Sequence, residues 1–142
     1  MSDEEATEDV VSGDGYAVAA NLGALGEGFG FRKVRKELGV TAFGVNAIVL
    51  PPRYETPAHF HDEQEELYIL LSGEMEIEFG DGTVHGLEPG GMARVAPEVH
   101  RLVRNTGDAE AAYVCIGGKD GYVGRDGRQP DEDDPAGTPI GS

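Results

Sequence analysis

The sequence predicts an all-β fold, an antiparallel sandwich or barrel formed by a single domain. The chain has 142 residues, which is enough for one domain with a real core. Short apolar or alternating runs recur along it, and they are separated by clusters of turn residues, among them many of the 22 glycines and 8 prolines. Short strands at such regular spacing are typical of β-sandwiches and barrels, which can enclose a ligand cavity.

The first third of the chain contains two predicted strands and one ambiguous segment. Residues 16–21 predict a short strand, which a glycine-rich link follows. Residues 31–38 alternate basic and apolar side chains only loosely, so Gly39 either caps a single helical turn or ends a strand. Residues 41–50 are apolar at alternating positions on both faces, which predicts a largely buried strand that ends at Pro51.

The middle of the chain predicts further strands joined by tight turns. Residues 74–79 alternate strictly, with three apolar side chains on one face and three glutamates on the other, so this strand is half exposed to water. Asp81-Gly82 suits the positive φ angles of a hairpin turn. Four more strands are predicted, at residues 83–87, 92–96, 99–104 and 111–116.

The chain is strongly acidic, with a formal net charge of −16. Residues 1–14 and 131–134 contain many of the carboxylates, and we expect both acidic ends to be disordered. Nucleic acid and anionic membranes need clustered Lys and Arg, so a partner of either kind is not expected. The predicted organisation is an acidic tail over residues 1–14, a barrel over 15–118, and a glycine-rich, acidic extension over 119–142 that drapes over the barrel.

No run of 18 apolar residues occurs, and the N-terminus lacks a basic and apolar leader. Neither a membrane span nor export is therefore expected, and we predict a cytoplasmic protein. Cys115 is the only cysteine, which excludes an intrachain disulfide. Its apolar neighbours predict a small buried residue without a catalytic role.

The clearest indication of chemistry lies between residues 57 and 73. If this segment is extended, His59 and His61 point to the same face of a sheet. Glu66 begins an apolar run with the composition of a buried strand, where an unpaired carboxylate would be costly. A metal ion held jointly with both histidines would compensate it. Two His and one carboxylate suit non-haem Fe(II), and also Mn, Ni, Cu or Zn. The alternative is a solvated His-x-His in a polar loop.

This segment resembles the first motif of the cupin superfamily, G-x5-H-x-H-x3,4-E-x6-G. It reads His59-x-His61-x4-Glu66-x6-Gly73, and only the leading glycine differs, with Arg53 in its place. The resemblance implies a double-stranded β-helix, which is a jelly-roll barrel, here with disordered acidic termini. It also implies a divalent transition metal (Fe, Mn, Ni, Zn or Cu) bound by the two histidines and the glutamate.

Residues 91–105 resemble the second cupin motif, G-x5-P-x-G-x2-H-x3-N, less closely. The histidine position of the motif falls on Arg101, and His100 stands one residue earlier. Two outcomes are open. A bulge before Asn105 could turn His100 inward as a fourth metal ligand. Alternatively Arg101 occupies that position and holds a carboxylate or phosphate of a substrate, or it neutralises Glu66, which would repel a divalent ion.

The resemblance leaves three functional hypotheses. The first is a metal-dependent enzyme of the dioxygenase, isomerase or decarboxylase type that acts on a small polar molecule, with Tyr68 and Arg101 as substrate-binding residues; Tyr68 could equally be core packing. The second is a non-catalytic small-molecule or metal-binding module, such as a sensor. The third is a protein in which His59 and His61 are hydrogen-bonded without an ion. Small cupins often pair through barrel edges, so a homodimer is expected.

Overall fold

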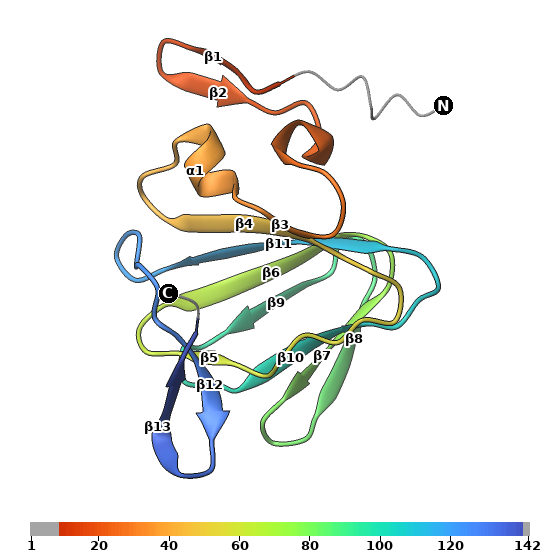
Figure 1. Ribbon diagram of the computed structural model, residues 1–142, viewed down its shortest axis with the longest axis vertical. Coiled ribbons are helices and arrows are strands. Elements are labelled where there is room, and N and C mark those ends of the chain that lie inside the picture. The colour runs from red at the N-terminus through yellow and green to blue at the C-terminus, as the bar shows by residue number, and fades with distance from the viewer. Residues whose placement is uncertain (1–8, 141–142) are drawn as a thin grey trace.

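The structure is a computed structural model that describes residues 9–140, and it is built mainly from short β-strands (Figure 1). The N-terminal elements are β1 (Val11–Gly13), β2 (Tyr16–Val18), the 3-10 helix η2 (Leu22–Leu25), β3 (Gly30–Arg32), α1 (Val34–Leu38) and β4 (Gly44–Leu50). The strands that follow are β5 (Phe60–His61), β6 (Glu65–Ser72), β7 (Met75–Phe79), β8 (Val84–Leu87), β9 (Met92–Val95), β10 (Arg101–Asn105), β11 (Ala111–Gly118), β12 (Gly127–Asp131) and β13 (Asp134–Pro139). Over residues 9–140, no helix has the length and apolar character needed to cross a bilayer.

The barrel consists of two main antiparallel sheets. One has the strand order β3-β4-β11-β6-β9, and the other has the order β10-β7-β8. β11 lies between strands that are far from it in sequence, so Tyr113 pairs with Ile48 on one side and with Leu70 on the other. These long-range pairings produce the predicted double-stranded β-helix, and the all-β prediction is confirmed.

The core forms where the inner faces of the two sheets meet. β6 shows the underlying alternation, because Glu66, Tyr68 and Leu70 are 8%, 2% and 0% exposed and share one face. Met75 and Ile77 of β7 project into the same cluster, as the alternating pattern of that strand predicted. The inner face of β6 is therefore apolar for most of its length and carries a carboxylate at its beginning.

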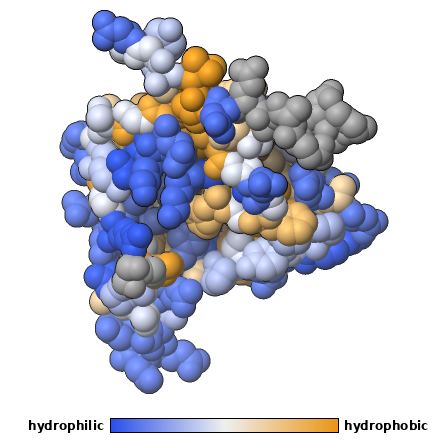
Figure 2. Space-filling view, turned by 45° about the horizontal axis from the view of Figure 1, so that its top comes forward, coloured by the Kyte–Doolittle hydropathy of each residue, from blue (hydrophilic) through white to orange (hydrophobic). Residues whose placement is uncertain are grey.

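The β1–β2 hairpin and α1 pack outside the barrel, on the side of β4. Residues 31–38, ambiguous in sequence, form the end of β3 and the single short helix α1, and Gly39 caps that helix with φ 77°. Glycine suits this position because side chains disfavour the left-handed conformation. Figure 1 shows α1 and the β1–β2 hairpin lying beyond β4, and Figure 2 shows apolar side chains gathered near the top of a largely hydrophilic surface.

The acidic ends differ in part from the prediction of disorder. Most of the predicted N-terminal tail, residues 1–8, lies outside the described residues, and Val11–Gly13 forms β1. Residues 131–134 connect β12 to β13 in an ordered hairpin, which corrects the prediction for that segment. The side chains of Asp131 and Asp134 accept backbone N–H groups two residues further on, both at 2.9 Å. Aspartates stabilise turns in this way, so the acidic residues of this segment help to form the turn.

Candidate metal site

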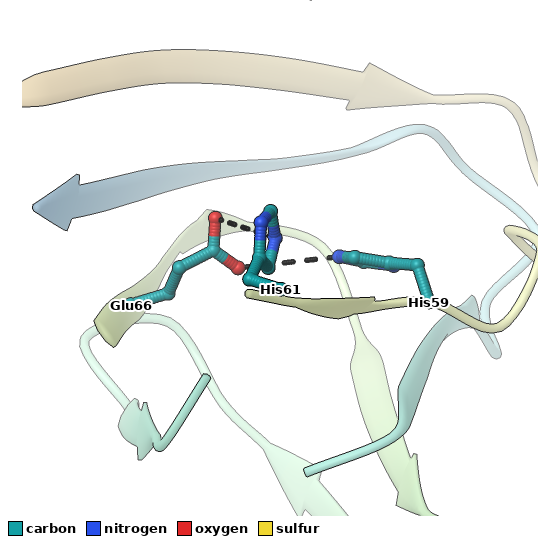
Figure 3. A group of neighbouring side chains, drawn as sticks. All are labelled: His59, His61 and Glu66. Atoms are coloured by element: carbon teal, nitrogen blue, oxygen red, sulfur yellow. Dashed lines mark ion pairs between the residues drawn. The ribbon is translucent and has the colours of Figure 1, made fainter. Parts of the chain in front are cut away.

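Two histidines and one glutamate converge on the inner side of β5 and β6. The segment around β5 is held to β10 by two backbone hydrogen bonds, His59 N to Arg101 O at 2.9 Å and Arg101 N to His59 O at 3.0 Å. Its extended conformation directs His59 and His61 to one face and Phe60 to the other. The ligand atoms of His59, His61 and Glu66 lie within 4.8 Å of one another, and Figure 3 shows both imidazoles directed toward the carboxylate.

The two oxygens of the Glu66 carboxylate have different environments. Oε1 accepts hydrogen bonds from the Tyr68 hydroxyl at 2.8 Å and from Nη2 of Arg101 at 2.9 Å. Oε2 lies 3.3 Å from Nε2 of His61, yet this buried nitrogen has no hydrogen-bond partner among residues 9–140. Nε2 of His59 lies 4.0 Å from Oε1. The protein thus engages one carboxylate oxygen fully, while the other faces an imidazole nitrogen that lacks a partner.

Arg101 neutralises Glu66, which is one of the outcomes predicted for it. β10 pairs with β7 in regular register, so Arg101 and Val103 face the interior and the Arg101 side chain has no solvent exposure. Besides Glu66, its guanidinium donates to the Tyr68 hydroxyl at 3.3 Å and to the carbonyl of Val99 at 2.5 Å. Each of its nitrogens donates to a protein acceptor, so none is exposed for the predicted contact with a substrate.

Tyr68 lies on the same face as Glu66, as the strand pattern predicted. It is only 2% exposed, and its ring stacks on Tyr113 with the ring centroids 5.8 Å apart. Its hydroxyl bridges the Glu66 carboxylate and the Arg101 guanidinium. Tyr68 is therefore a core residue that orients Glu66, and the structure does not direct its hydroxyl toward solvent.

His100 lies outside the group, which corrects its prediction as a fourth ligand. Its ring stacks on Phe60, with centroids 4.4 Å apart and planes at 9°. Phe60 points away from the face that carries His59 and His61. The predicted bulge before Asn105 does not occur, because β10 keeps a one-to-one register with β7 from Arg101 onward.

The charges around the group favour a neutral His59 and an ionised Glu66. Burial, aided by the positive charge of Arg101, lowers the pKa of His59 from 6.5 to about 4. Burial alone would raise the pKa of Glu66, but His61 and Arg101 hold it well below its usual range. Burial alone would lower the pKa of His61, but Glu66 and Asp126 outweigh burial and raise it. At neutral pH, His61 is therefore ready to hold a proton or a cation between itself and Glu66.

Asp126 is a residue of the site that the sequence did not reveal. Its carboxylate lies 2.8 Å from Nδ1 of His61 and accepts the backbone N–H groups of Glu63 and Gln64 at 2.7 and 2.9 Å. The residue after it, Gly127, pairs with His61 as β12 adds to β5. Asp126 is 65 residues from His61, in a glycine-rich segment without strand periodicity, so no sequence signal linked the two.

The donor set fits a divalent transition metal. Ligands that each lie about 2.1 Å from one ion are roughly 3.0–3.4 Å apart, and the 3.3 Å between His61 Nε2 and Glu66 Oε2 already has this spacing. The positive charge of Arg101 opposes a cation, but its guanidinium lies on the other oxygen, Oε1. Asp126 places a second negative charge against His61. His59, His61 and Glu66 together could therefore hold a metal ion.

Access to this group is narrow. The side chains of His59 and His61 are 24% and 10% exposed. A surface hollow of about 450 Å³ reaches Glu66, and another of about 470 Å³ reaches His100. Neither of these two hollows is lined by His59 or His61. Both imidazoles therefore lie largely within the protein, and His59 is the more exposed of the two.

Solved structures share this architecture. A sugar phosphate isomerase from a cupin superfamily, from Silicibacter pomeroyi, superposes with a TM-score of 0.62 at 24% sequence identity, over 72% of this chain and 66% of that chain. A cupin protein from Bacteroides fragilis gives a TM-score of 0.59 at 26% identity, over 79% of this chain and 86% of that chain. A conserved protein with a double-stranded β-helix domain from Klebsiella pneumoniae gives 0.57 at 21% identity, over 64% and 76%. No curated protein matches the chain.

Sequence comparison supplies the family. The family model for the cupin domain matches residues 47–117, which make up half of the chain. The matched segment contains His59, His61 and Glu66 and also Arg101, so it includes both motifs that resembled those of cupins. Because the family model matches half of the chain and the fold is a double-stranded β-helix, the chain belongs to the cupin family.

Proposed function

We propose that this protein is a cupin that binds a divalent transition metal through His59, His61 and Glu66. The observation that carries the proposal is the pairing of His61 Nε2 with Glu66 Oε2, 3.3 Å apart, in which the buried nitrogen has no hydrogen-bond partner among the described residues. A buried polar atom without a partner is costly, and when the His61 ring is neutral with its lone pair on Nε2, this nitrogen and the carboxylate oxygen repel each other. A cation between them removes both costs.

The charge balance of the site is compatible with a bound cation. Glu66 and Asp126 are carboxylates, and among residues 9–140 Arg101 is the fixed positive charge that contacts Glu66. With both imidazoles neutral, the three charged side chains sum to one negative charge. A divalent ion would leave the site with one positive charge, which would attract an anionic or polar ligand to its open coordination positions. The buried guanidinium reduces the affinity for the ion, so we expect weaker binding than in a site without it.

The substrate or ligand proposed for this site is a small polar molecule. His59 is the most exposed of the three candidate ligands, so a ligand would approach from its side. A divalent transition metal held by two histidines and a carboxylate can polarise a bound carbonyl or activate oxygen, which would suit an isomerase, decarboxylase or dioxygenase. The contribution of the chain itself is the neutral imidazole of His59 and the fixed carboxylate of Glu66.

A second candidate function is non-catalytic binding of a metal or a small molecule, as in a sensor. The observation that favours it is the position of Arg101. The residue at the histidine position of the second motif is a buried arginine whose nitrogens donate to protein acceptors. In the structure, the polar groups of Tyr68 and Arg101 are buried and hydrogen-bonded within the protein, so neither is directed toward solvent to act as an acid or a base on a ligand. This arrangement supports binding better than turnover.

Metal content and affinity test the proposal. The purified protein would be stripped with a chelator and titrated with Zn²⁺, Mn²⁺ and Fe²⁺ in competition with a chromophoric chelator. We expect His61→Ala and Glu66→Gln to abolish tight binding. His100→Ala and His85→Ala are matched controls, because one ring stacks on Phe60 and the other lies beside Phe79, and neither belongs to the group. Unchanged binding in His61→Ala, or equal loss in His100→Ala, would refute the proposal.

The catalytic and non-catalytic candidates differ in turnover. Once a bound metal is identified, the loaded protein would be screened against small hydroxy and keto acids, sugars and sugar phosphates by thermal shift. Each ligand that stabilises the protein would then be tested for oxygen consumption and for isomerised or decarboxylated product. Product formation that His61→Ala abolishes supports the enzyme, and stabilisation without product supports the binding module.

A further inference from the structure

Asp126 is a buried carboxylate that contacts the candidate ligand His61 and the loop that follows it. It is 9% exposed, and its oxygens accept from the backbone of Glu63 and Gln64 and from the Gln64 side chain at 2.5 Å, in addition to their contact with His61. These donors belong to the loop that connects β5 to β6. One carboxylate therefore organises the chain between the histidine pair and Glu66.

The contact between Asp126 and His61 determines which imidazole nitrogen carries a proton. An ionised carboxylate only accepts hydrogen bonds, and Asp126 already accepts three N–H groups from Glu63 and Gln64. Nδ1 of His61, 2.8 Å away, must then donate its proton. In the neutral ring the lone pair lies on Nε2, which faces Glu66 Oε2 at 3.3 Å. Carboxylates that accept from the far nitrogen of a histidine orient many metal ligands in this way.

The C-terminal hairpin holds Asp126 in place. β12 pairs with β5 through Gly127 and Arg128, and Arg128 Nε donates to both oxygens of Asp62 at 2.9 and 3.0 Å. Gly137 of β13 lies so close to Phe60 that an added Cβ would meet the ring at 2.8 Å. Figure 1 shows this hairpin beside β5, at the end of the chain. Both strands that follow Asp126 are thus fixed to the segment that carries His59 and His61.

We propose that Asp126 is the positioning residue of the metal site, and that the C-terminal hairpin is the part of the fold that places it. Its carboxylate holds His61 in the tautomer with the proton on Nδ1, so that the Nε2 lone pair is aimed at the ion that Glu66 shares. The inference rests on the proposed metal function for its purpose, but the tautomer can be measured without a metal. The extension at residues 126–140 is then part of the site, although it lies outside the segment that the family model matches.

The first test uses the full-length wild-type protein without metal. Long-range ¹H–¹⁵N spectra of the histidine rings, recorded above the pH at which the same spectra show that His61 has lost its second proton, report which nitrogen carries the remaining proton. We expect Nδ1–H for His61. A ring with its proton on Nε2 would overturn the inference. Because no substitution is involved, this measurement does not depend on the folding of a variant.

The second test compares Asp126→Asn with Asp62→Asn. The first removes the charge that accepts from His61, and the second removes the Arg128 ion pair of the same segment without contact to His61. We expect Asp126→Asn to shift His61 toward the Nε2–H tautomer and to lower the Zn²⁺ affinity about 10–100-fold. Asp62→Asn should leave the tautomer unchanged and the affinity within about threefold of wild type, since that pair is at the surface.

The outcomes separate this inference from the proposed function. If wild-type protein binds Zn²⁺ and Asp126→Asn binds it equally well, the inference is wrong. If wild-type protein binds no metal but His61 shows the Nδ1–H tautomer and loses it in Asp126→Asn, positioning by Asp126 stands and the metal function fails. Loss of affinity together with the tautomer shift supports both. If Asp126→Asn does not fold, the wild-type tautomer decides, and Gln64→Ala adds a check: it removes a competing donor from the oxygen that contacts His61, so the Nδ1–H tautomer should persist, and its loss would contradict the inference.

Discussion

Replacing Arg101 by methionine tests whether this arginine is the internal counterion of Glu66. The Arg101 side chain has no solvent exposure and the Glu66 side chain is 10% exposed, so water cannot replace the lost guanidinium. Breaking a buried ion pair by removing one partner lowers the free energy of unfolding by about 3–5 kcal/mol. Small domains have total stabilities of about 5–15 kcal/mol, so the variant should still fold but with much of its margin lost.

Urea unfolding followed by circular dichroism, at pH 7 and without metal, measures this loss. With a slope of about 2 kcal/mol per molar urea, a loss of about 4 kcal/mol lowers the midpoint by about 2 M. Adding Glu66→Gln to Arg101→Met removes the carboxylate that the first substitution leaves unpaired. The free energy of unfolding of the double variant should therefore fall by roughly 1–3 kcal/mol less than the sum of the two single losses. Arg104→Met is the matched control. It lies on the same strand and pairs with Glu76 and Glu78, but these partners are partly exposed, so its midpoint should shift much less.

Metal addition extends the same comparison. If the ion takes the place of the guanidinium as the partner of Glu66, saturating Zn²⁺ should raise the midpoint of Arg101→Met more than that of wild type, and the variant should bind Zn²⁺ more tightly. The reasoning is refuted if Arg101→Met and Arg104→Met shift the midpoint equally, or if the Arg101 and Glu66 substitutions are additive.

Three further predictions follow from the geometry and the electrostatics. Metal binding should weaken by up to about tenfold per pH unit as the pH falls below the raised pKa of His61, because a proton competes for Nε2. His59, with a pKa of about 4, stays neutral over this range. Competition titrations between pH 5.5 and 8.5 test this, and a flat profile would contradict it. Gly73→Ala should lower the urea midpoint far more than Gly82→Ala. Both glycines have positive φ, but of the two only Gly73 lies so close to the backbone that an added Cβ would be 2.7 Å from Cα of Ala111. Equal shifts would show that the close approach is unimportant. The Cys115 thiol should resist a thiol reagent until the protein unfolds, because burial, together with the negative charge of Glu66, raises its pKa well above the usual range; rapid labelling of the native protein would show that the interior opens.

Local patterns in the sequence determined much of this protein. Alternation along residues 65–72 predicted that Glu66 and Tyr68 share a buried face, and both do. Alternation around Phe60 likewise predicted that His59 and His61 lie together. A strand has a side-chain period of two, so nearest neighbours on one face can be read from a single strand. The predicted barrel followed from the repeated strands and turns.

Tertiary structure decided the identity of the groups that surround those three residues. Whether His100 or Arg101 faces inward depends on a one-residue register between β10 and β7, and a slip of one residue exchanges the two faces of a strand. Asp126 reaches His61 only because β12 pairs with β5, a contact between segments 65 residues apart. Strand order and register between distant segments result from the packing of the whole chain, and no single stretch of sequence encodes them.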